Sequence, residues 1–328
     1  MTKLQRLFRY LLENTNCFVL LLLPYYFIRF VYSSLKERSL WFYRYPMGHF
    51  GSTIPSKLDL LAHEERIFTV VTKHIPGVDL NIHFQLELLS EFSQYNRPFA
   101  RSRDHQNGAR YYSENYSFRA ADALILYCMI RRYRASTIIE IGSGFSSALM
   151  LDIRNSDMPD LDLTFIEPYP HTLERLLSES DREICTIMER KIQDVPLDFF
   201  DKLEPNSILF IDSSHALKIG SDLSTIFFAI LPRLKPGVLV HFHDIFWPFE
   251  YPKKMIYEGR LWNEIYLVRS FLQFNDSFEI IFFPSFLQEV YGETLRSKLA
   301  SYDEFSASSL WLRRKPSPSH SAGIWAGN

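Results

Sequence analysis

The chain contains few cysteines, and they are scattered. The three cysteines of its 328 residues are Cys17, Cys128 and Cys185. They form no Cys-x-x-Cys pair and no even-numbered framework, so the sequence gives no sign of disulfides or of structural zinc. We therefore expect the globular part of the protein to fold in a reducing compartment.

The sequence also lacks an excess of charge of one sign. It has 36 Lys and Arg against 38 Asp and Glu, which gives a formal net charge of -2, and the two signs are interspersed. A basic field is the electrostatic signature of proteins that bind nucleic acid, so its absence argues against a nucleic-acid partner. The chain is 47% hydrophobic, enough for a sizeable core in one large domain with additions or in two small domains.

No apolar run reaches the roughly 20 residues of a membrane-spanning helix. The best candidate, residues 17–32, has Pro24 near its middle and meets Arg29, and no small-residue cleavage site of a secretory signal follows it. Three interpretations stay open: a short spanning anchor, an interfacial helix, or a helix buried against the domain. Its aromatic residues favour membrane association, with the rest of the chain in the cytoplasm. If the segment packs on the domain, we expect a cytoplasmic protein.

Glycine is sparse as well, with 12 residues, yet two of them lie one residue apart in the stretch that says most about a ligand. Residues 138–147 read IIEIGSGFSS, which predicts a buried strand, a tight turn and a helix. Glycine is needed there because a ligand must approach the backbone closely. A dinucleotide site would usually have a third glycine where Ser147 stands. An acid, Glu140, precedes the first glycine by two residues.

A second acid follows the next predicted strand. The stretch from Leu161 to Ile166 alternates in polarity and ends in Glu167 and Pro168. The distance from the glycines to Glu167 is close to the roughly 20 residues expected for a carboxylate that binds ribose hydroxyls. The alternative is an acid that is merely solvated at the end of a strand.

The Glu-x-Gly-x-Gly turn with its following acid resembles motif I of the class I methyltransferases that use S-adenosylmethionine (SAM). SAM carries a sulfonium cation and no pyrophosphate, so an acidic rim suits it better than an anion cradle. The resemblance implies that SAM is bound by Glu140, Gly142, Ser143, Gly144 and Glu167. Asp194 matches a position that often contacts adenine in this family, although a solvated loop acid is an equal alternative there.

Strands and helices alternate after residue 118, which predicts an α/β fold with helices on both faces of a mostly parallel sheet. The predicted strands are 137–141, 163–166, 185–188, 207–211, 237–242, 278–283 and 309–313. A reversed last strand beside the sixth would match the Rossmann-like, seven-stranded sheet of the methyltransferases. Helical spacing of apolar residues predicts helices over 57–74, 80–92, 118–132 and 265–274.

We divide the chain into four parts. Residues 1–46 form a hydrophobic and aromatic segment with the candidate membrane anchor. Residues 47–117 form a helical extension with a loop over the active-site cleft, and 118–315 form the class I methyltransferase domain. Residues 316–328 are rich in Ser, Pro and Gly and are predicted to be disordered.

Ionisable side chains follow the fourth and fifth predicted strands. Asp212 and His215 come after residues 207–211, and His243 and Asp244 end the next strand. Ligands of open α/β sheets bind at the carboxyl ends of strands, so we expect these side chains to converge near the cofactor. His241, two residues earlier, is expected to be packed rather than catalytic.

This layout resembles a subgroup of class I enzymes with Asp-x-Ser-His after strand four, which includes metal-dependent sugar and small-molecule O-methyltransferases. The resemblance implies a general base, His215, with Asp212 as a second catalytic group. It also implies a divalent cation, Mg²⁺ or Mn²⁺, on Asp212, His243 and Asp244. Imidazole at 243 departs from the oxygen ligands that Mg²⁺ prefers. Helix capping or a cofactor contact is the alternative for His215, and loop hydrogen bonds are the alternative for His243 and Asp244.

The expected function is SAM-dependent methylation of a hydroxyl on a sugar, lipid-linked or other small acceptor. One alternative is a membrane-tethered SAM-binding protein without catalysis. Another is a metal hydrolase, which would leave the glycine turn unexplained. The aromatic stretch 246–252 is expected to be a substrate lid, with packing on the sheet edge or contact with a membrane as alternatives. The sequence specifies neither the acceptor nor the oligomeric state.

Overall fold

The structure is a computed structural model that describes residues 24–25, 28, 45, 48–70, 72–101, 108–299 and 307–316. Apart from single residues, the candidate anchor (17–32) and the predicted tail (316–328) lie outside the described residues. In the described part of the chain, no helix combines the length and the hydropathy that a bilayer crossing requires. The chain divides after His63 into two compact units.

The described helix of the first unit is α3 (Lys57–Ala62). The Ser56 hydroxyl caps its start by accepting a hydrogen bond from the Asp59 backbone N–H at 3.3 Å. The helix ends at His63, whose φ of -126° is not helical. The second unit then begins with α4 (Glu64–Phe68). A single helix over 57–74 was therefore a wrong prediction, because the backbone breaks at His63 and leaves helical geometry after Phe68.

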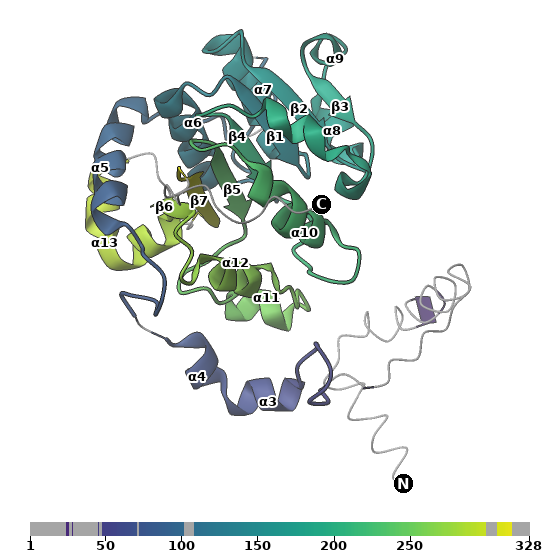
Figure 1. Ribbon diagram of the computed structural model, residues 1–328, viewed down its shortest axis with the longest axis vertical. Coiled ribbons are helices and arrows are strands. Elements are labelled where there is room, and N and C mark those ends of the chain that lie inside the picture. The colour runs from purple at the N-terminus through teal and green to yellow at the C-terminus, as the bar shows by residue number, and fades with distance from the viewer. Residues whose placement is uncertain are drawn as a thin grey trace, which may run out of the picture. The chain divides into compact units, whose positions relative to one another are not determined.

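The second unit contains a seven-stranded sheet in the order β3-β2-β1-β4-β5-β7-β6 (Figure 1). Its strands are β1 (Thr137–Ile141), β2 (Asp162–Ile166), β3 (Thr186–Met188), β4 (Ile208–Ile211), β5 (Leu239–His243), β6 (Phe278–Phe282) and β7 (Ser309–Arg314). The first five strands are parallel, and β7 runs antiparallel to both of its neighbours. The seven strand predictions, including the reversed last strand, are confirmed.

Helices pack on both faces of this sheet (Figure 1). The helices predicted over 80–92, 118–132 and 265–274 are confirmed as α5 (Ile82–Phe92), α6 (Ala120–Tyr133) and α12 (Glu264–Leu272). The helix after the glycine turn is α7 (Phe145–Ser156), and α8 (His171–Leu176) and α9 (Asp181–Ile184) follow β2. Shorter helices α10 (Asp222–Thr225) and α11 (Lys253–Tyr257) flank β5 in the sequence. Helix α13 (Pro284–Lys298) was not predicted.

The central strands are mostly apolar because both faces of the sheet are covered. Every residue of β4 is buried, as are the last four of β1. Backbone hydrogen bonds join the loops at the carboxyl edge of these strands: Gly142 N–H donates to Ile166 O at 3.0 Å, and Asp212 N–H donates to Ile141 O at 2.9 Å. The loops after β1, β2 and β4 are therefore held together at one edge of the sheet.

Candidate active site

The turn between β1 and α7 requires glycine at its first position. Gly142 has a φ of +87°, a conformation that other residues rarely adopt. A Cβ atom there would lie 1.8 Å from the carbonyl oxygen of Asp212. Gly144 differs, because its backbone is extended and a Cβ would meet only Thr172 Cγ2 at 3.6 Å. Close approach of the β4 loop therefore fixes the residue type at 142.

Glu140 lies beneath this turn. Its carboxylate is fully buried and accepts hydrogen bonds from the hydroxyls of Ser146 and Ser147 at the start of α7. Burial raises the pKa of Glu140 to about 8, although the two serine hydroxyls oppose the shift. The acid that we expected on the rim of the cleft thus lies inside the protein, where it fixes the first turn of α7.

Glu167 extends from the end of β2 across the same turn. One carboxylate oxygen accepts the Ser143 backbone N–H at 3.2 Å, and the other accepts the Tyr169 N–H at 2.8 Å. These bonds fix the carboxylate and leave lone pairs free, since an ionised carboxylate can accept about four hydrogen bonds. The side chain can therefore receive ligand hydroxyls.

Two adjoining cavities follow the carboxyl edge of the sheet, and we call them together the cofactor cleft. The larger, about 450 Å³, is lined by residues that include Ile166, Glu167, Ile192, Gln193 and Asp212. The smaller, about 210 Å³, is lined by residues that include Tyr116, Gly142, Ser143, Gly144, Glu167 and Asp212. Gly142, Glu167 and Asp212 line both. The volume of the larger cavity is in the range of small-molecule sites, and its walls combine apolar side chains with many polar and charged ones.

Asp194 does not line either cavity. It ends a short 3₁₀ helix after β3 and is exposed, whereas its neighbours Ile192 and Gln193 line the larger cavity. The predicted loop is thus at the cleft, but the residues that face the cavity are the two before the predicted acid.

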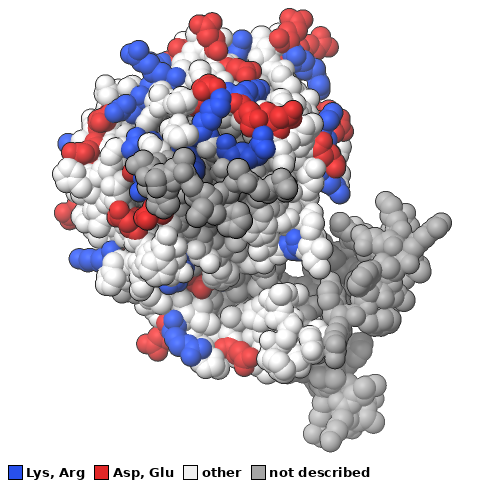
Figure 2. Space-filling view, in the orientation of Figure 1, with Lys and Arg blue, Asp and Glu red and all other residues white. Residues whose placement is uncertain are grey.

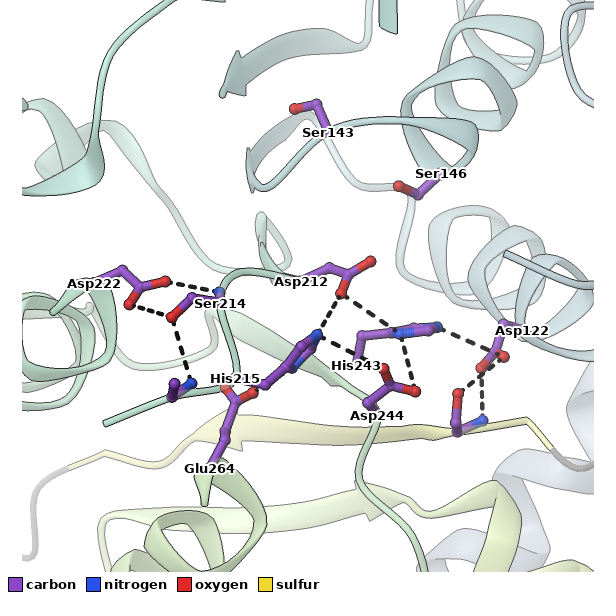
Figure 3. A network of polar contacts seen from close by, with 12 residues as sticks. Asp122, Ser143, Ser146, Asp212, Ser214, His215, Asp222, His243, Asp244 and Glu264 are labelled. Carbon is purple, nitrogen blue, oxygen red and sulfur yellow. Dashed lines mark hydrogen bonds and ion pairs between the residues drawn. The ribbon is translucent and has the colours of Figure 1, made fainter. Parts of the chain in front are cut away.

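Six ionisable side chains meet where β4 and β5 end (Figure 3), and one of them, Asp212, lines the smaller cavity. The members of this carboxylate–histidine cluster are Asp122, Asp212, His215, His243, Asp244 and Glu264. His215 Nδ1 lies 2.7 Å from Glu264 Oε2, and its Nε2 lies 3.2 Å from Asp212 and 3.6 Å from Asp244. The structure therefore brings together the four residues that the sequence predicted after strands four and five.

The strand order, the glycine turn after β1 and the acid after β2 agree with the predicted methyltransferase fold. Residues 139–245, which include the glycine turn, the acid after β2 and strands β2 to β5, match a family model described as a methyltransferase domain. This part of the chain is a class I SAM-dependent methyltransferase domain. The narrower resemblance to the Asp-x-Ser-His subgroup stays a prediction.

This methyltransferase is also similar to one uncharacterised protein and to solved methyltransferase structures. An uncharacterised protein of Archaeoglobus fulgidus is 36% identical over 170 residues, which cover 50% of this chain and 76% of that protein. The O-methyltransferase TomG from Streptomyces achromogenes, in complex with SAM, has a TM-score of 0.38 at 14% identity over 71% of this chain and 90% of that chain. A SAH-bound methyltransferase from Podospora anserina has a TM-score of 0.41 at 14% identity, over 81% and 100%. Likenesses of this size say nothing about the acceptor.

His215 contacts three carboxylates of the cluster. Burial alone would lower the pKa of its imidazole, but the hydrogen bonds to Asp212 and Glu264 outweigh burial and raise it to about 10. Its backbone φ of 56° and the 54° of Asp244 are left-handed. Such conformations in residues other than glycine concentrate at functional sites.

His243 links the two predicted carboxylates to a third. Its Nδ1 lies 3.6 Å from Asp212 and 3.7 Å from Asp244, while Nε2 lies 3.7 Å from Asp122. Burial would lower the pKa of His243, yet Asp212 and Asp244 raise it well above its usual range. Burial would raise the pKa values of Asp212 and Asp244, but the nearby imidazoles outweigh it and lower both.

The cluster does not fit the divalent cation that the subgroup resemblance implied. Asp212 and Asp244 each lie within 4 Å of both imidazoles as ion pairs. Within the described ranges, no group of three or more His, Cys, Asp or Glu side chains has an arrangement that could hold a metal ion. The carboxylates that would bind a cation are instead balanced by His215 and His243.

The aromatic stretch 246–252 packs into the protein, which was the alternative to a lid. Phe249 and Tyr251 are 1% exposed, and the Trp247 N–H donates to the Ser285 hydroxyl on α13 at 3.0 Å. His241 is also packed, as predicted: its ring stacks on Phe210 with centroids 3.8 Å apart.

Two members of the cluster were missed from the sequence. Glu264 begins α12 and looked like an ordinary acid at a helix start, where negative charge is favourable. Asp122 lies among apolar residues in the first turn of α6 and is 6% exposed. Its carboxylate also accepts the Ser308 backbone N–H at 3.0 Å. An unexplained acid on an apolar helix face was the one available signal.

Figure 2 shows Lys and Arg side chains interspersed with Asp and Glu over the described part of the visible face. This distribution agrees with the balanced charge of the sequence.

Proposed function

We propose that this enzyme transfers the methyl group of SAM to a hydroxyl of a small acceptor, with His215 as general base. The observation that carries the proposal is the arrangement of the His215 ring. Its Nδ1 is held by Glu264, and its Nε2 is directed at Asp212 and Asp244. The two aspartates are 28% and 19% exposed, while Glu264 is 1% exposed. The ring therefore connects the protein interior to the cleft.

SAM would occupy the cofactor cleft, with its ribose hydroxyls on Glu167. The backbone of Gly142, Ser143 and Gly144 would pass close to the cofactor, and Glu140 would support this turn from below. Ile192 and Gln193 would contact the adenine in place of Asp194. When bound, SAM supplies a methyl group on a sulfonium, which is already activated for transfer.

The protein's task is then to align the acceptor and remove its proton. In the neutral form of His215, Nδ1 carries the proton donated to Glu264, and Nε2 is free to accept the hydroxyl proton. The acceptor oxygen forms its bond to the methyl carbon as the carbon–sulfur bond breaks, which leaves SAH. Asp212 and Asp244 stabilise the imidazolium that forms, so no metal ion is required for charge balance.

The cleft favours an acceptor with more than one hydroxyl. Asp212 and Asp244 can each accept a hydrogen bond, and they lie 3.2 Å and 3.6 Å from His215 Nε2 (Figure 3). The Trp262 ring, with its centroid 4.3 Å from that of His215, supplies an apolar face of the kind that stacks on sugars. A sugar or another small polyol, free or linked to a lipid, fits this combination.

The test is methyl transfer from labelled SAM to cell extract separated into small-molecule, lipid, glycan and protein fractions. We expect label in a glycan, lipid-linked or small-molecule fraction, and its loss with His215→Gln while SAM binding is retained. Glu167→Ala should instead weaken SAM binding itself. Unchanged transfer by the His215 variant, or label in the protein fraction alone, would overturn the proposal.

A further inference from the structure

The segment just before α6 is built as a rigid strap, which we define as residues 110–118. Its first end is fixed to α7, where the Asp152 carboxylate accepts the backbone N–H groups of Arg110 at 2.9 Å and of Tyr111 at 2.8 Å. At its other end, Phe118 is buried and packs on His243 with ring centroids 5.5 Å apart. The strap therefore runs from α7 to the carboxylate–histidine cluster.

Asn115 holds the middle of the strap in one conformation. Its side-chain oxygen accepts the backbone N–H groups of Ser117 at 3.0 Å and Phe118 at 2.6 Å. Its amide nitrogen donates to the carbonyls of Tyr112 at 2.7 Å and Phe118 at 2.6 Å. Asn115 is 7% exposed, so a single buried side chain makes four hydrogen bonds that order the loop.

This ordered loop presents Tyr116 at the smaller cavity of the cofactor cleft. The ring packs edge-on against Phe145, with centroids 5.5 Å apart, yet the residue is 72% exposed. Its hydroxyl lies 3.4 Å from the Thr172 hydroxyl on α8. A large aromatic ring is thus held at the mouth of a cavity without contributing to the core, a placement that suits contact with a ligand.

The proposed SAM site decides which part of the ligand lies there. Glu167 lines both cavities, so the ribose would lie between them. The larger cavity contains Ile166 and Ile192 and suits the adenine. The smaller cavity, bounded by Tyr116, Gly142 and Asp212, then receives the methionyl part with its sulfonium.

We propose that the ring of Tyr116 covers the sulfonium and makes this methyltransferase bind SAM in preference to SAH. The face of an aromatic ring attracts a cation, and the attraction is larger where water is excluded. The sulfonium of SAM is charged, whereas the thioether of SAH is not. The ring therefore stabilises bound SAM, and this attraction is lost when transfer of the methyl group leaves SAH. This inference rests on the proposed SAM placement.

Calorimetric titration with SAM and with SAH tests the inference. Tyr116→Leu should weaken SAM binding by about tenfold and SAH binding by less than about twofold, given the size of cation–π attraction. Tyr116→Phe keeps the ring and should bind both ligands within about twofold of wild type. Tyr169→Leu is the matched control, because Tyr169 is also exposed, at 69%, and lines the larger cavity. It should leave the SAM-to-SAH ratio unchanged.

Equal weakening of SAM and SAH by Tyr116→Leu would overturn the inference, and so would a loss in Tyr116→Phe as large as in Tyr116→Leu. The thermal unfolding midpoint of each variant separates these effects from misfolding. Failure of the underlying SAM site gives a different result: wild type would not bind either ligand, or Glu167→Ala would leave both affinities intact.

Discussion

His215 Nδ1 lies 2.7 Å from Glu264 Oε2, and this contact joins the loop after β4 to the first residue of α12. Both residues are buried, at 6% and 1% exposure. A carboxylate at this position fixes the ring orientation and the tautomer of the histidine. It also makes the imidazole harder to deprotonate, so the same contact that positions the base restricts its use at neutral pH.

Replacing Glu264 with Gln should move the pH dependence of methyl transfer to lower pH. The base must be neutral, and the pKa of His215 is raised to about 10, so the wild-type rate should climb through the alkaline range. Gln can still accept the Nδ1 proton but has no charge, so the pKa of His215 should fall by about one unit or more. The pH–rate profile of kcat from pH 6 to 10.5 measures the shift.

Glu250→Gln is the matched control for this experiment. Glu250 is a carboxylate bonded to the Tyr266 hydroxyl outside the cluster, and its replacement should leave the profile in place. A Glu264→Gln profile that scales down at every pH without moving would contradict a base role for His215 and would indicate a structural role for the contact.

Alanine substitutions at Gly142 and Gly144 should have different effects on stability. Gly142→Ala places a Cβ 1.8 Å from the Asp212 carbonyl oxygen at a φ of +87°, so we expect the free energy of unfolding to fall by more than about 2 kcal/mol. Gly144→Ala meets only Thr172 Cγ2 at 3.6 Å and should change stability by less than about 1 kcal/mol. Urea unfolding followed by circular dichroism compares them. If both substitutions lowered the free energy of unfolding equally, the loop after β4 would be able to move away from residue 142.

The strands could be predicted from the sequence because each is a local apolar run with a clear end. The β4 run, for example, continues directly into Asp212. The partners of a side chain were not predictable in the same way. Glu264 reaches His215 across 49 positions in sequence, and no local pattern encodes that distance. The prediction that Glu140 lies on the rim of the cleft failed for a related reason. The sequence places Glu140 at the end of a strand before the glycines, but it does not show that Ser146 and Ser147 of α7 cover and bind its carboxylate.

Turnover should survive removal of divalent metal ions. The carboxylates of Asp212 and Asp244 already face His215 and His243 at 3.2 to 3.7 Å, so the oxygen atoms that would bind a cation already have imidazole partners within the protein. We expect methyl transfer after dialysis against EDTA to stay within about twofold of the untreated enzyme, because the nearby imidazoles already favour the charged form of these carboxylates. A loss of turnover that added Mn²⁺ or Mg²⁺ restores, at unchanged SAM affinity, would contradict this expectation.

Replacing the buried His241 with Phe should stabilise the enzyme, most strongly at acid pH. The described structure offers neither ring nitrogen of His241 a hydrogen-bond partner, and burial, with the charge of nearby His243, lowers its pKa well below 6.5. Because the unfolded chain then binds a proton that the folded chain does not, wild-type stability falls as pH drops below about 6.5, at about 1.4 kcal/mol per unit. Phe cannot take up a proton and retains the stacking on Phe210.

The free energies of unfolding of wild type and His241→Phe should thus differ by about 1 kcal/mol at pH 7 and diverge further toward pH 5. His74→Phe, at an exposed ring, is the control, and parallel wild-type and His241→Phe curves would show that the ring is protonated in the fold.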